Sequence, residues 1–240
     1  MSLSISDDFP APNGYDSSHN GLEDAFVVKL SASGGAVEYG TFVGGNANDR
    51  GNSIAIDGAG AAYVAGYSLS NTFPAQPSSY DRDPNGLSDA VVFKLAPNGK
   101  SLSYATYLGG GADDVAAAIA IGSQGQAYLA GTTLSANFPL QGALDSSPNG
   151  STDIFVAALS PTGAALSYGS YLGGELIDSA DGMALDPSGD LVLTGFSESP
   201  DFPIGSGPVD SSQNGDHDII LVRLALGAEP PDPPAPPVAS

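Results

Sequence analysis

Four short loops carry the side chains most able to do chemistry in this 240-residue chain. The fullest of them runs from Asp81 to Asp89, with oxygen-bearing side chains at its first, third, fifth and ninth positions and Gly86 at its sixth. Calcium takes about six to eight oxygen ligands, which alternate side chains and a backbone carbonyl of a tight loop can supply. This loop is therefore the best candidate for a calcium site.

The same loop recurs three more times, so the candidate ligands form four equivalent sets. They are Asp81, Asp83, Asn85 and Asp89, then Asp16, Asn20 and Asp24, then Asp145, Asn149 and Asp153, and finally Asp210, Asn214 and Asp218. The spacing resembles the Asp-x-Asp-x-Asp-Gly-x-x-Asp calcium hairpins of integrin-type propellers. Only Asp83 keeps a carboxylate at the third position, which predicts modest affinity. Asn-Gly is also a common hairpin turn, and Asp often bonds local amides, so these loops are interpreted either as calcium sites or as turns alone.

A second series of carboxylates follows each Gly-Gly pair. It consists of Asp49, Asp114 and Asp178, with Asp113 and Asp181 nearby. Paired acids can hydrolyse glycosides. Recurrence at the same turn of every repeat favours turn capping instead. A catalytic serine needs a base, and the chain has only His19 and His217, both in polar loops, and no cysteine. We therefore predict no enzyme.

The elements that position these loops belong to an internal repeat of about 65 residues. Its first segment occurs four times, at Asp24–Leu30, Asp89–Leu95, Asp153–Leu159 and Asp218–Leu224. An aromatic segment ending in Gly-Gly, two more short apolar segments and a Phe-Pro pair follow in register. Short runs of Val, Ile, Tyr and Phe between turn residues are typical of strands. The chain is thus predicted to be all-β, a β-propeller-like array of four-stranded blades with about three and a half repeats.

The set of motifs resembles a known family. Between residues 9 and 224 the motifs recur in the order Asp-Ala-Phe-Val-x-Lys-Leu, Tyr-x-Thr-Tyr-Leu-Gly-Gly, Ile-Ala-Ile-Asp, Tyr-Val-Ala-Gly and Phe-Pro. This order is similar to the bacterial SBBP family of β-propeller repeats. The resemblance implies a propeller blade in a secreted or surface protein, and it brings no catalytic residues with it.

The repeat also sets the predicted boundaries. These are a partial repeat at 1–23, repeats at 24–88, 89–152 and 153–217, an orphan strand at 218–228 and a proline-rich tail at 229–240, interpreted as a stiff spacer or a docking strip. Closed propellers need about four to eight blades. The array is therefore either a fragment of a longer chain or is completed between molecules by strand addition.

The charge limits the partners. Six Lys and Arg stand against 27 Asp and Glu, a net charge of −21, which excludes a nucleic-acid footprint and disfavours an anionic membrane surface. No apolar run approaches a membrane span, and no secretory signal is visible. We expect an extracellular structural or adhesive protein that assembles with copies of itself, with calcium as its cofactor. The alternative is a glycan- or protein-binding module from a larger surface protein.

Overall fold

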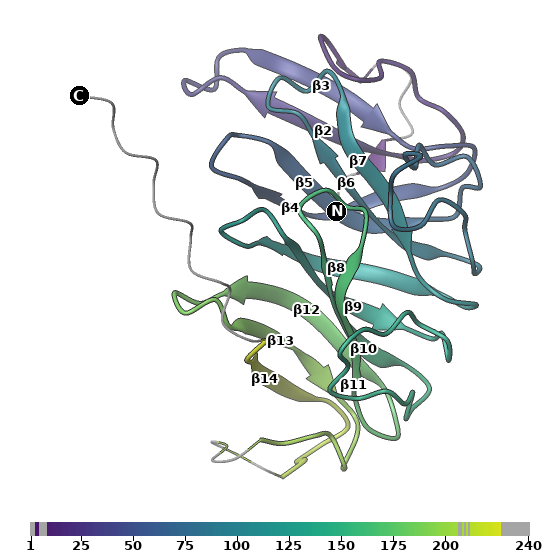
Figure 1. Cartoon of the computed structure of the whole chain (residues 1–240), viewed down its shortest axis with the longest axis vertical. Coiled ribbons are helices and arrows are strands. Elements are labelled where there is room, and N and C mark those ends of the chain that lie inside the picture. Colours follow the sequence, from purple (N-terminus) through teal and green to yellow (C-terminus); the bar gives the residue numbers. More distant parts are fainter. Residues whose placement is uncertain (1–2, 5–8, 206–207, 209, 211, 227–240) are drawn as a thin grey trace.

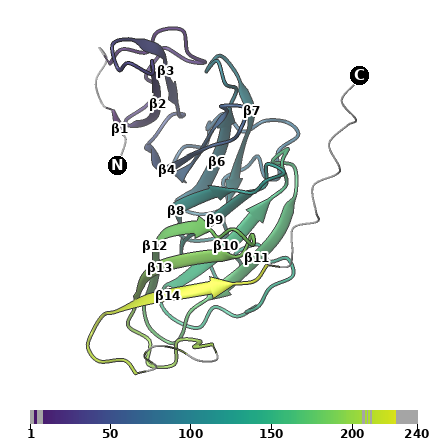
Figure 2. The ribbon, with the colours of Figure 1, turned by 90° about the vertical axis from the view of Figure 1, so that its left-hand side faces the viewer.

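The computed structural model describes residues 3–4, 9–205, 208, 210 and 212–226, and these residues form an all-β structure. In this part of the chain, fourteen strands make four antiparallel sheets, which follow one another along the long axis of the molecule (Figures 1 and 2). The described residues do not close into a ring. The predicted all-β class is confirmed. The predicted tail at 229–240 lies outside the described residues.

Two complete four-stranded sheets lie between two three-stranded ones. Sheet 1 contains β1 (Leu3–Ser4), β2 (Asp24–Leu30) and β3 (Val37–Val43). Sheet 2 contains β4 (Asp49–Ile56), β5 (Ala62–Ser68), β6 (Asp89–Leu95) and β7 (Leu102–Leu108). Sheet 3 contains β8 (Asp114–Ile121), β9 (Ala127–Thr133), β10 (Asp153–Leu159) and β11 (Leu166–Leu172). Sheet 4 contains β12 (Asp178–Leu185), β13 (Leu191–Ser197) and β14 (Asp218–Leu224).

Each complete sheet combines strands from two successive sequence repeats. In sheet 2, β4 and β5 belong to the sequence repeat 24–88, whereas β6 and β7 belong to the repeat 89–152. The strands are paired in chain order, each with its neighbour. The long loop between the second and third strands carries both the Phe-Pro pair and the Asp-Asn-Gly motif. The sheets are thus offset by half a repeat from the sequence landmarks.

The third strand of each complete sheet is buried on both faces. We call the face toward the next sheet along the chain the forward face and the opposite one the backward face. Ala25 and Val27 on the forward face of β2 pack with Val91, Phe93 and Leu95 on the backward face of β6. The equivalent residues form the cores between sheets 2 and 3 and between sheets 3 and 4. Such two-sided burial explains the apolar runs of these strands.

Hairpin turns seal these cores from one side. Gly99, in the turn after β6, has a φ of +70°, and a Cβ atom there would lie 2.3 Å from the ring of Tyr39 in the preceding sheet. Gly163 has the same role after β10, against the ring of Tyr104. Only glycine combines this left-handed conformation with so close an approach. Each turn therefore covers a core tyrosine of the sheet before it.

The first strands of successive sheets also contact each other. The Asn52 side chain of β4 donates a hydrogen bond to the Ala116 carbonyl of β8 at 2.9 Å, and the Ile119 amide donates one to Ser53 Oγ at 3.3 Å. These two hydrogen bonds join the first strand of sheet 2 to the first strand of sheet 3. No helix long and apolar enough to span a membrane occurs in the described residues.

Candidate functional site

The Asp81–Asp89 loop is closed by its own hydrogen bonds. Asp81 Oδ1 accepts the backbone amide of Asp83 at 3.1 Å, and Asp81 Oδ2 accepts the side-chain amide of Asn85 at 2.6 Å. Asp89 Oδ2 accepts the backbone amide of Asn85 at 2.6 Å. The first and ninth residues of the loop are thus both bonded to the asparagine between them.

The other three loops repeat this network. The acceptor carboxylates are Asp16 and Asp24, Asp145 and Asp153, and Asp210 and Asp218, and the asparagines bonded to them are Asn20, Asn149 and Asn214. N–H donors that point at a carboxylate are the arrangement of an Asx turn. Among the described residues, no three acidic or histidine side chains are grouped so as to hold a metal ion. The turn interpretation accounts for this geometry, and calcium binding stays a prediction.

Calcium binding is tested by thermal unfolding in chelator and in Ca²⁺. With a dissociation constant of about 1 mM, as in weak extracellular sites, 10 mM Ca²⁺ should stabilise the chain by about 1.4 kcal/mol per site. Asp83→Ser should remove most of the gain at the Asp81 loop, because Asp83 supplies the only charge at the third position. Equal melting temperatures of the parent in chelator and in Ca²⁺ would contradict the calcium prediction.

The acids of the second carboxylate series are the first residues of β4, β8 and β12, which are the first strands of sheets 2, 3 and 4. Asp49 begins β4, and its Oδ2 accepts the Gly45 amide at 2.7 Å and the Ser70 hydroxyl at 2.6 Å. Asp114 and Asp178 accept the equivalent amides and hydroxyls at the starts of β8 and β12. All three acids are fully buried. They cap the Gly-Gly turns, and a substrate cannot reach them.

The structure brings the two carboxylate series together, which the sequence reasoning missed. Asp89 of sheet 2 and Asp114 of sheet 3 flank Gly109: a Cβ atom there would lie 2.4 Å from Asp89 Oδ1 and 2.8 Å from Asp114 Oδ2. The same arrangement is formed by Asp24 and Asp49 around Gly44, and by Asp153 and Asp178 around Gly173. Each junction between sheets therefore contains a buried pair of acids. The sequence signal that could have revealed these pairs is the common period of about 65 residues in both carboxylate series, with the first glycine of the Gly-Gly pair between the two acids.

Electrostatics makes these pairs costly when both acids are ionised. Burial raises the pKa of Asp89 to about 6; the hydrogen bond from Asn85 opposes this, and the charge of Asp114 adds to it. Burial likewise raises the pKa of Asp24 to about 6 and raises the pKa of Asp153. Oδ1 of Asp24, Asp89 and Asp153 is buried without a hydrogen-bond partner in the described part of the chain. The pairs are consequently structural elements under electrostatic strain.

Comparison with known families agrees with the repeat. Residues 38–74 match the family model of the SBBP β-propeller repeat. This segment carries the SBBP repeat. The resemblance inferred from the motifs is confirmed over these residues. A search of curated proteins found no match. The matched SBBP segment begins in β3, includes β4 and β5 and ends at the Phe73-Pro74 pair, so it contains Asp49 but not the Asp81 loop.

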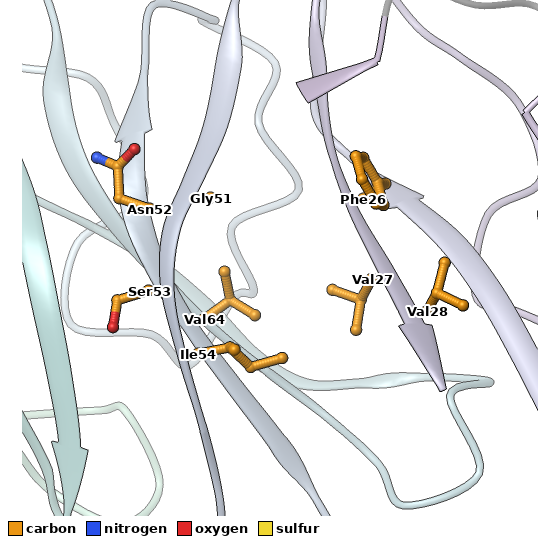
Figure 3. A pocket seen from close by; sticks show the side chains of 8 residues that line it. All are labelled: Phe26, Val27, Val28, Gly51, Asn52, Ser53, Ile54 and Val64. Carbon is orange, nitrogen blue, oxygen red and sulfur yellow. The ribbon is translucent and has the colours of Figure 1, made fainter. Parts of the chain in front are cut away.

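Two hollows are lined mostly by residues of the SBBP segment, and neither lining contains a set of catalytic side chains. One hollow of about 270 Å³ lies between β2 and the strands β4 and β5 of sheet 2 (Figure 3). It is lined by Phe26, Val27, Val28, Gly51, Asn52, Ser53, Ile54 and Val64. The other, of about 410 Å³, is shallow and lined by Asn20, Gly21, Gly44, Gly45, Asn46 and Thr72. Neither lining includes an acid or a histidine. The features that recur from sheet to sheet are the buried acid pairs at the sheet junctions and the hydrogen-bonded Asp-Asn-Gly loops, and not these hollows.

Proposed function

We propose that the chain is a non-enzymatic extracellular structural or adhesive protein whose SBBP repeats form propeller-like blades and which assembles with copies of itself through its incomplete end blades. The observation that carries this proposal is the bare forward face of β14. Ile219 is 88% exposed and Leu221 is 76% exposed. The secreted or surface location comes from the family resemblance alone.

Repeat equivalence identifies the kind of surface that fits this face. The residues equivalent to Ile219 and Leu221 are at most 4% exposed in the other sheets, because the backward face of the next sheet covers them: Ala25 and Val27, Ala90 and Val92, Ile154 and Val156. Sheet 1 carries a backward face of the same kind, formed by Phe26, Val28 and Leu30. Leu30 is 56% exposed. The two ends are thus the two halves of one recurrent junction.

The edge of β14 supports the same proposal. In sheets 2 and 3 a fourth strand, β7 or β11, pairs with the third one. In sheet 4 no strand of the described residues takes this position beside β14. Unpaired strand edges are a common route to association between chains. Since the contact joins two different surfaces, it is heterologous and builds rings or open filaments.

The test is the mass in solution as a function of concentration, measured by light scattering on a sizing column. The parent should form oligomers that grow with concentration. The double variant Ile219→Lys/Leu221→Lys should weaken association by about 100-fold or more, because burying two large aliphatic side chains is worth a few kcal/mol. Both positions are exposed, so the fold should tolerate lysine.

Leu87→Lys is the matched control, because Leu87 is 76% exposed like Leu221 but lies in the loop before β6. It adds positive charge without touching the forward face, and it should assemble like the parent. A parent that stays monomeric at high concentration would contradict the proposal. A double variant with the mass of the parent would do so as well.

A further inference from the structure

Sheet 1 has a strand position that is filled over only two residues. β1 pairs with β2 in the register Leu3↔Ala25 and Ser4↔Asp24. In sheet 2 the same register is Tyr67↔Ala90 and Ser68↔Asp89, and there β5 continues along β6 as far as Ala62↔Leu95. β1 therefore stands for the last two residues of a second strand. Along the inner edge of β2, from residue 26 to residue 30, the described residues place no partner strand.

The cleft of about 270 Å³, which has Asn52 and Ser53 beside its apolar lining, lies at this position. Val27 on one side and Ile54 and Val64 on the other line it (Figure 3). Ile54 is 54% exposed, whereas Ile119 at the same position of β8 is 5% exposed. Ile119 is covered because β4 and β5, the first two strands of the preceding sheet, pack on β8. The described residues of sheet 1 supply only β1 at the corresponding positions.

The complete sheets show what fills the position. Segments 62–66, 127–131 and 191–195 run antiparallel to β6, β10 and β14, and read Ala-Tyr-Val-Ala-Gly, Ala-Tyr-Leu-Ala-Gly and Leu-Val-Leu-Thr-Gly. Each is joined by a short turn to the first strand of its own sheet, and the first strands β4 and β8 pack against the first strand of the next sheet. At the junction of sheets 2 and 3, Asn52 and Ser53 make that contact through side-chain hydrogen bonds. A single β-hairpin could therefore pair with the open edge of β2 through its second strand and cover the exposed side chains of β4 with its first strand.

We propose that this cleft is a binding site for a β-hairpin of the SBBP type, whose second strand pairs antiparallel with β2 and whose first strand covers Ile54. The ligand is a two-stranded segment with the sequence pattern of residues 51–66, because β1 already occupies the positions that correspond to Tyr67 and Ser68. Strand addition of this kind gains affinity from main-chain hydrogen bonds and specificity from alternate side chains. The inference goes beyond the proposed self-association, because it assigns a ligand to the open inner edge of β2 and to the exposed Ile54, neither of which belongs to the Ile219 and Leu221 face of β14.

The experiment uses the full chain and a synthetic peptide with the sequence of residues 51–66, labelled with a fluorophore and followed by fluorescence anisotropy. Saturable binding with one peptide per chain is expected. The peptide variant Val64→Pro should bind at least about tenfold more weakly, because proline removes a ladder donor and disfavours the central strand. A scrambled peptide of the same composition should not bind.

A matched pair of chain variants locates the site. Ile54→Lys should weaken binding by about tenfold or more, since it places a charge in the apolar contact. Leu144→Lys, at a position 69% exposed in the loop before β10, should bind like the parent. Equal affinities of the native and Val64→Pro peptides, or of the parent and Ile54→Lys chains, would overturn the proposal.

The outcome is independent of the light-scattering result. The Ile219→Lys/Leu221→Lys chain leaves the cleft intact and should bind the peptide with parental affinity, even where the chain is monomeric. Peptide binding by a chain that never self-associates would support this inference and contradict the proposed function. Oligomers that form while the peptide fails to bind would do the reverse.

Discussion

Gly109→Ala should lower the free energy of unfolding by about 3 kcal/mol. The new Cβ would lie 2.4 Å from Asp89 Oδ1 and 2.8 Å from Asp114 Oδ2. Neither acid can move aside without loss: Asp89 is tied to the Asn85 amide at 2.6 Å, and Asp114 to the Gly110 amide at 2.7 Å. Both acids are buried, so a broken hydrogen bond would leave a polar group without solvent. Urea unfolding followed by circular dichroism measures the loss.

Gly58→Ala is the control for this substitution. Gly58 lies in the turn between β4 and β5, a Cβ atom there would have no heavy atom within 4 Å, and its φ is not in the left-handed region. Its replacement should leave stability unchanged or raise it by a few tenths of a kcal/mol, because alanine restricts the unfolded chain. Equal unfolding midpoints for the two variants would refute a steric role of Gly109 between the two acids.

The strands could be predicted closely where composition and landmarks coincide. The predicted segments Asp24–Leu30 and Asp89–Leu95 are β2 and β6 to the residue. The first strands are longer than their apolar motifs: β4 begins at Asp49, five residues before the Ile-Ala-Ile-Asp motif that begins at Ile54. A register shift between Gly51 and Ser53 lets polar and small residues continue the strand. A break in the ladder of this kind has no apolar pattern, so composition cannot reveal it.

The acid pairs depend on distances that no local pattern contains. Asp89 and Asp114 are in different sheets, and only the stacking of sheet 2 on sheet 3 brings them to the two sides of Gly109. The loops were predictable as turns, because Asp, Asn and Gly at fixed offsets favour local hydrogen bonds. The inward orientation of Asp89 Oδ1 was not, since it follows from tertiary packing. The sequence periodicity thus predicted both carboxylate series, but it did not predict that an acid of one series lies close to an acid of the other.

Acidification from pH 8 to pH 5, in the presence of a chelator, should raise the melting temperature. The folded pKa of Asp89 is about 6, above the ordinary value of 3.8, because burial and the nearby Asp114 disfavour its ionised form. Its contribution to stability is therefore fully present below pH 3.8 and is lost as the pH rises through 6. Asp24 follows the same direction, with a pKa of about 6. Below about pH 4 the trend reverses, because acids with lowered pKa values such as Asp57 lose their stabilising charge.

The variant Asp89→Asn separates this pair from the general repulsion of a chain with a net charge of −21. The amide keeps the shape of the acid, stays neutral at every pH and can donate a hydrogen bond toward Asp114. It should stabilise the chain at pH 8 by on the order of 2 kcal/mol and reduce the difference between pH 8 and pH 5. Asp83→Asn removes the same charge from an exposed position of the same loop, and should leave the pH dependence as in the parent. If the two variants respond alike, the pH dependence comes from net charge and not from the buried pair. If only Asp89→Asn flattens it, the acids at the sheet junction are the source, and each junction of the repeat holds its sheets together most tightly in mild acid.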